Sequence, residues 1–172
     1  KANSAVTLDS VLIDGRQKTN SAIQIMQADA TSSLAVSNCY FVNFVNTFIL
    51  LKQSTARVNI KFNTFNGRGI NKLTAIYLAN GVKNIKVEGN SFEFLYNGIY
   101  VVGKEIKQNS EITISNNYLN LGWFAKDLFS IKKDNSSIKS LKNNLLKIDT
   151  QNFALEQVGY IRIEQNVLET NN

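Results

Sequence analysis

The chain has 172 residues, of which 44% are hydrophobic and 19% charged, and its formal net charge is +6. This length and composition fit one globular domain with a sizeable core and exclude a disordered chain. No apolar run approaches the roughly 18 residues that a membrane-spanning helix needs. The sequence has no histidine and a single cysteine, Cys39, which excludes an internal disulfide, a thiolate metal cluster and any site built on histidine.

A short pattern of the form apolar-x-apolar-x-x-Asn-x-apolar recurs along the chain at intervals of 23 to 28 residues. Its copies begin at Val6, Leu34, Val58, Ile85, Ile112, Ile138 and Ile161. A second apolar segment follows each of the first six copies, at residues 22–26, 48–52, 75–79, 98–102, 128–132 and 153–157. Apolar and polar residues alternate in both segments, which predicts strands with one buried face.

Strands at this spacing predict a coil that stacks on copies of itself. In a parallel β-helix, coils stack at about 4.8 Å, so equivalent residues lie above one another. One predicted apolar column holds Ile13, Phe41, Phe65, Phe92, Leu119, Leu145 and Leu168. Another, in the second strand, holds Ile23, Ile49, Ile76, Ile99, Phe129 and Phe153. We therefore predict an all-β fold, a single-stranded right-handed parallel β-helix of about seven coils. Residues 1–172 would form one domain or a fragment of a longer protein.

The asparagine of the pattern forms a column of its own. Its position holds Val11, Cys39, Asn63, Asn90, Asn117, Asn143 and Asn166. Asparagine tolerates unusual backbone angles at a bend, and its amide can donate to one coil and accept from another. We predict a buried asparagine ladder that ends at Val11 and Cys39, with Cys39 as an apolar filler rather than a nucleophile. Ser140 interrupts one apolar column, through either a shifted register or a local hydrogen bond.

With its asparagine ladder, aliphatic stacks and coil length, the chain resembles the right-handed parallel β-helix superfamily. That superfamily includes pectate lyases, chondroitinase-B-like and alginate lyases, related epimerases and phage tailspikes. The resemblance covers essentially the whole chain. It implies a lysine or arginine that abstracts the proton next to a uronate carboxylate, often with calcium on an Asp/Glu cluster.

No catalytic motif of these lyases can be matched residue by residue, so no catalytic residue is predicted. No two acids fall on adjacent coils of the outward columns of the first strand. No metal site is therefore predicted, and calcium is implied by the resemblance alone. Lys61 and Glu88 do fall on adjacent coils, which predicts a cross-strand ion pair.

Aromatic and basic residues cluster around the outward column of the second strand. That column holds Gln24, Leu50, Tyr77, Tyr100, Ser130 and Ala154. Ring faces beside cations suit an anionic sugar, because the rings stack on its apolar face and the cations meet its charge. The predicted binding residues are Tyr77, Tyr100, Trp123, Arg68, Lys72 and Lys104. The alternative is a structural tyrosine ladder covered by a loop.

Two functions stay open from the sequence. The first is a carbohydrate-active module that binds an acidic polysaccharide, with or without cleaving it by β-elimination as a lyase. The second is a non-catalytic structural or adhesive β-helix of a cell-surface or phage tail protein. Basic residues are scattered over all faces, which argues against a nucleic acid partner.

The sequence also bears on context. The start, "KANSAVTLDS", shows neither an initial Met nor a signal-peptide core, so we interpret the chain as a mature protein or a piece of a longer one. The resemblance implies an extracellular, cell-surface or periplasmic location. Solenoid ends need caps, and we expect oligomer contacts or neighbouring sequence to cover them.

Overall fold

A computed structural model describes residues 4–68, 73–79, 82, 84–95, 97–102, 111–120, 129–133, 144–150, 160–164 and 167–169. These residues form three six-stranded sheets, which we name A, B and C. Sheet A consists of β1 (Ala5–Asp9), β4 (Ser33–Ser37), β7 (Arg57–Lys61), β10 (Ile85–Glu88), β13 (Glu111–Ser115) and β17 (Tyr160–Glu164). Sheet B consists of β2 (Leu12–Asp14), β5 (Tyr40–Val42), β8 (Thr64–Asn66), β11 (Ser91–Glu93), β14 (Tyr118–Asn120) and β18 (Val167–Glu169). Sheet C consists of β3 (Ile23–Met26), β6 (Thr47–Lys52), β9 (Thr74–Ala79), β12 (Asn97–Val102), β16 (Asn144–Thr150) and β15 (Phe129–Lys133).

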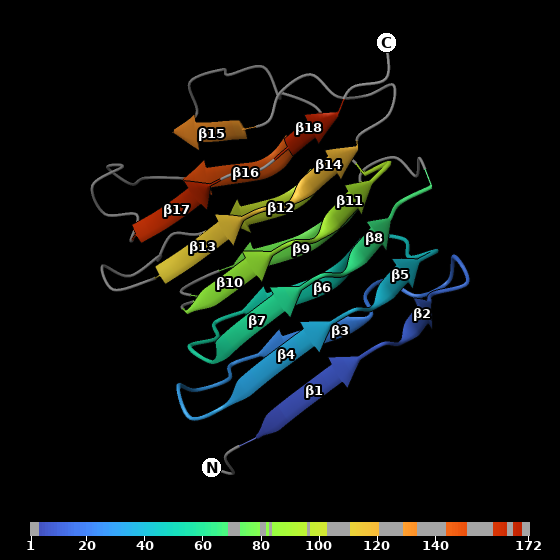
Figure 1. Cartoon of the computed structure of the whole chain (residues 1–172). Coiled ribbons are helices and arrows are strands. Elements are labelled where there is room, and N and C mark those ends of the chain that lie inside the picture. The colour runs from blue at the N-terminus through green and yellow to red at the C-terminus, as the bar shows by residue number, and fades with distance from the viewer. Residues whose placement is uncertain are drawn as a thin grey trace.

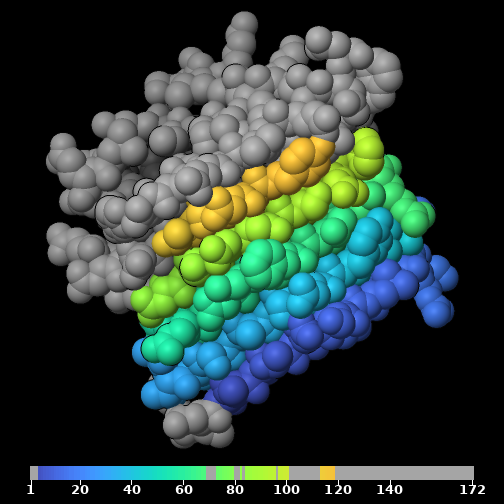
Figure 2. All heavy atoms as spheres, viewed as in Figure 1, coloured from blue at the N-terminus to red at the C-terminus, as the bar shows by residue number. Residues whose placement is uncertain are grey.

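The chain winds through the three sheets in turn, as Figure 1 shows. It runs along sheet A, bends into sheet B, returns along sheet C and then advances to the next coil, in a right-handed sense. Every recorded pairing between neighbouring strands is parallel. In Figure 2 the coils appear as diagonal bands that follow one another in chain order. The predicted parallel β-helix is confirmed.

Up to Leu119 in sheet B and Ile99 in sheet C, the apolar columns stack in the register that the repeat predicts; beyond them, Leu168 and not Leu145 follows Leu119, and Leu146 and not Phe129 follows Ile99. Phe41 pairs with Phe65, and Phe65 pairs with Phe92. Their rings stack at centroid distances of 4.8 and 5.3 Å, and all three are fully buried. In sheet C, Ile49 and Ile76 continue the core in the same way. Because burial of apolar surface stabilises a fold by about 25 cal/mol per Å², these columns are the main source of stability.

The predicted asparagine ladder is present at Asn63, Asn90 and Asn117, each only 1% exposed. The backbone N–H groups of Cys39, Asn63 and Asn90 each donate to the side-chain oxygen of the asparagine one coil on, at 2.9 to 3.0 Å. Cys39 is buried, as predicted, and its thiol donates to the carbonyl oxygen of Ser37 at 3.1 Å. Asn143 and Asn166 lie outside the described residues.

The predicted coil beginning at Ile138 is wrong, so each sheet has six described strands rather than seven. β13 pairs directly with β17, which places Ile114 against Ile163. Residues 144–150 join sheet C between β12 and β15 instead. The physical reason is the sequence pattern: a coil at Ile138 would place the polar Ser140 in register with the buried Ile114, where β17 places an isoleucine instead. Ser140 itself and residues 153–157 lie outside the described part.

Candidate functional site

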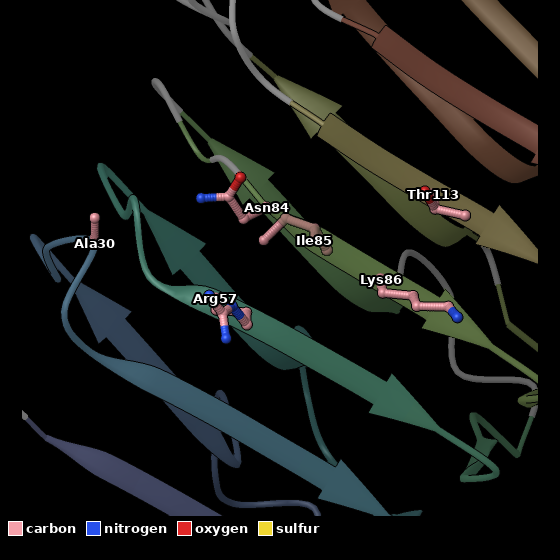
Figure 3. A pocket seen from close by; sticks show the side chains of 6 residues that line it. All are labelled: Ala30, Arg57, Asn84, Ile85, Lys86 and Thr113. Carbon is pink, nitrogen blue, oxygen red and sulfur yellow. The ribbon is translucent and has the colours of Figure 1, made fainter.

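An open groove lies on sheet A, where its strands begin. It has a volume of about 370 Å³ and is lined by Ala30, Arg57, Asn84, Ile85, Lys86 and Thr113. Figure 3 shows these side chains on β7, β10 and the turn before it, β13, and the connection from β3 to β4. We call this set the sheet A groove. Its lining combines an arginine and a lysine with an amide, a hydroxyl and two apolar side chains.

Hydrogen bonds of the coil-to-coil turns hold the rim of the groove. Asn84 has a left-handed backbone, with φ of 54°, a conformation that asparagine adopts more readily than most residues. Its carbonyl oxygen accepts the N–H of Val58 at 2.9 Å. The backbone N–H of Arg57 donates to the carbonyl oxygen of Ser32 at 3.1 Å. The backbone positions of Arg57 and Asn84 are therefore fixed by neighbouring coils.

The outward face of β7 and β10 carries a surplus of positive charge. Lys61 and Lys86 both bind the Oε2 of Glu88, at 3.1 and 3.0 Å, which confirms the predicted pair of Lys61 with Glu88. The hydrogen bonds from Lys86 and then Lys61 hold the pKa of Glu88 below its usual range. One carboxylate thus serves two ammonium groups. Among the described residues, no ion pair engages the exposed Arg57.

The predicted tyrosine contact is present on sheet C. Tyr77 of β9 and Tyr100 of β12 are neighbours in register. Their ring centroids lie 5.3 Å apart, with the planes almost perpendicular at 87°. Both side chains are half-buried. This geometry suits a structural pair as well as a binding platform, so the role in sugar binding stays a prediction.

Of the other predicted binding residues, only Arg68 lies in the described part of the chain. Lys72, Lys104 and Trp123 lie outside the described residues. Arg68 is exposed at the bend after β8, where its backbone N–H donates to Asn66 Oδ1 at 3.0 Å. The pKa of Asp14 on sheet B is lowered mainly by hydrogen bonds from the Arg16 backbone and the Asn43 amide, and only slightly by the positive charge of Arg68.

Metal binding finds no support in the described part of the chain. No group of three or more His, Cys, Asp or Glu side chains there could hold an ion. Nor does that part contain a helix long and apolar enough to cross a membrane.

Sequence reasoning missed Arg57 and Asn84 as groove residues. Each of them directly precedes a copy of the repeat, at Val58 and Ile85. Extending the pattern by one residue toward the N-terminus would have aligned them. The chain matches no known family model, and no curated protein or solved structure matches it significantly.

Proposed function

We propose that this protein binds an acidic polysaccharide across the outward face of β7 and β10. The observation that carries the proposal is the charge surplus there. Arg57, Lys61 and Lys86 supply three positive charges, and Glu88 supplies one negative charge. A polymer with repeated carboxylates or sulfates offers several acceptors to such a surface, and arginine binds these groups in a bidentate way.

The remaining lining of the groove suits a sugar. Asn84 and Thr113 offer an amide and a hydroxyl to sugar hydroxyl groups, while the exposed Ala30 offers apolar contact. Binding sites for small molecules combine a few placed polar groups with apolar walls in this manner. The pair of Tyr77 and Tyr100 would give the polymer a second contact on sheet C.

The proposal also places the chain with the pectate-lyase-like β-helices and in an extracellular or periplasmic setting, where such polymers occur. Cleavage by β-elimination is a further version of it, since a lysine or arginine can serve as the base in that reaction. A lyase would convert the bound polymer to an unsaturated product that absorbs ultraviolet light. The alternative, a structural or adhesive β-helix, predicts no affinity for such polymers in solution.

The test measures binding to pectate, alginate and a glycosaminoglycan, with a neutral glucan as the reference polymer. We expect binding to at least one polyanion and weakening by salt, because screening reduces contacts between charges. The double variant Arg57→Gln/Lys86→Gln should bind about five- to thirty-fold more weakly, at about 0.5–1 kcal/mol per exposed charge contact. Arg16→Gln/Lys18→Gln, an equal loss of two charges on the exposed turn after β2, should leave binding unchanged. Absence of binding, or an equal effect of all variants, would overturn the proposal.

A further inference from the structure

The bend from sheet A into sheet B carries an aromatic residue in an unusual backbone conformation. Phe62 follows β7 directly and has a φ of 56°. This left-handed conformation is unfavourable for a bulky residue. Burial does not compensate for it, because the Phe62 side chain is 60% exposed. Strain of this kind concentrates at functional positions, so Phe62 is a candidate functional residue.

The other coils place different residues at this bend. The left-handed positions that follow β1, β4, β10 and β13 are Ser10, Asn38, Gly89 and Asn116. Asparagine and glycine adopt this conformation more readily than phenylalanine does. The fold therefore needs a residue in the left-handed conformation here, but that conformation does not require a phenylalanine.

Gly89 on the next coil makes room for the Phe62 ring. A Cβ atom at Gly89 would lie 2.5 Å from Cδ1 of Phe62 and 2.6 Å from Cε1. The ring therefore rests against the bare backbone of the neighbouring bend. The N–H of Phe62 also donates to the carbonyl oxygen of Glu88 at 3.0 Å. These contacts fix one side of the ring and leave much of the side chain open to solvent.

The charge surplus of sheet A lies directly beside this ring. Phe62 follows Lys61 in the chain, and Gly89 follows Glu88, the carboxylate that Lys61 and Lys86 share. The sheet A groove lies toward the other end of the same strands. At about 3.3 Å per residue, the stretch of β7 from Arg57, at the far end of the groove, to Phe62 spans about 17 Å, enough for an oligosaccharide rather than a single sugar.

We propose that the exposed face of Phe62 is a stacking platform for one sugar ring of the acidic polysaccharide. Lys61 and Lys86 would meet the carboxylate or sulfate of that sugar, and the polymer would run along β7 and β10 from the groove to the bend. Aromatic rings stack on the apolar faces of sugar rings, and the lysines supply charge complementarity. This inference rests on the proposed function and adds the position and orientation of the ligand.

The test replaces Phe62 by residues that suit the backbone but cannot stack. Phe62→Asn should raise the melting temperature by about 2–4 °C, because asparagine relieves the strain, and should weaken polysaccharide binding about tenfold. Phe62→Leu keeps an apolar cover over Gly89 without a flat face, and it should weaken binding as well. Phe62→Tyr keeps the ring and should bind like the wild type.

Phe94→Asn is the matched control. Phe94 is also left-handed, with φ of 52°, and 40% exposed, but it lies at the bend after β11, away from sheet A. It should gain stability without losing affinity. If the wild type binds and Phe62→Asn binds equally well, the stacking inference is overturned while the proposed function stands. If the wild type binds no polyanion, the proposed function fails, and the inference that rests on it fails too.

Discussion

Asn63 and Asn90 form one rung of a buried ladder that ties neighbouring coils together. The Oδ1 atom of Asn90 accepts both the side-chain Nδ2–H and the backbone N–H of Asn63, each at 3.0 Å. Asn90 in turn donates Nδ2–H to the Oδ1 of Asn117 at 3.0 Å and to the carbonyl oxygen of Ile60 at 2.9 Å. Each amide therefore satisfies polar groups on two coils that would otherwise be buried without partners.

Asn90→Ala should be the most damaging change in the ladder. It leaves the backbone N–H of Asn63 and the carbonyl oxygen of Ile60 without these partners. Each buried unsatisfied group costs about 1–3 kcal/mol, so we expect the free energy of unfolding to fall by about 3 kcal/mol or more. Urea denaturation measures the loss. Asn59→Ala, on the outward face of β7, should cost less than about 0.5 kcal/mol; equal losses would contradict the ladder's role.

Gly89→Ala should destabilise the fold through both the backbone and the Phe62 ring. The φ of 65° at Gly89 costs an alanine about 1–2 kcal/mol, and the new Cβ would displace the ring. In a Phe62→Asn background the second cost should vanish. We therefore expect a coupling energy of about 1 kcal/mol in the double-mutant cycle, measured by urea denaturation. Additive effects would show that the ring does not rest on Gly89.

Asp14 should make the stability of the protein sensitive to acid. The Oδ1 atom of Asp14 accepts the backbone N–H of Arg16 at 2.8 Å and the side-chain N–H of Asn43 at 2.9 Å. These hydrogen bonds lower the pKa of Asp14. The pKa of Asp14 is therefore lower in the folded than in the unfolded protein, so its charged form stabilises the fold. This stabilisation is complete above the ordinary aspartate pKa, near about 4, and is lost as the pH falls through the lowered pKa of the folded protein.

Asp14→Asn tests this expectation, because the amide keeps the accepting oxygen but cannot titrate. The melting temperature should fall less steeply on acidification in the variant than in the wild type. Parallel curves for the two proteins between neutral pH and the acid range would mean that Asp14 does not contribute.

The order of strands in sheet C can be checked by crosslinking. The register places Tyr100 beside Lys147 of β16, and Lys147 beside Ser130 of β15. Adjacent parallel strands lie about 4.8 Å apart, within the Cα separation that a disulfide spans. Tyr100→Cys/Lys147→Cys should therefore form a disulfide under mild oxidation, in a Cys39→Ala background.

Tyr100→Cys/Ser130→Cys is the control pair. The column predicted from the sequence places these two residues on adjacent coils, where they could form a disulfide. Two strand spacings separate these residues, about 10 Å, which is too far for a disulfide. Preferential crosslinking of this pair, read by mass spectrometry of peptides, would contradict the strand order β12, β16, β15.

The fold of the first five coils could be predicted because one repeated pattern carries it. Period-two alternation marked the strands, and like residues at like offsets marked the columns, as Phe41, Phe65 and Phe92 show. The candidate site was harder to predict from the sequence. Arg57 is the first residue of β7 and Asn84 lies in the turn before β10, each one position ahead of the apolar pattern, which marks buried positions and does not identify them. The polar contact of Asn97 Nδ2 with Thr74 Oγ1 at 3.1 Å was not anticipated either.

By itself, the sequence determined that the chain stacks parallel strands with apolar columns and an asparagine ladder, since these features depend on local alternation and equal spacing. Only the tertiary structure decided which strand lies beside which after β13. Residues 144–150 have a pattern that suits any sheet of the coil, and their place between β12 and β15 is set by parallel backbone pairing with both strands. That choice is made by contacts between residues far apart in the chain, and alternation within one segment does not encode it.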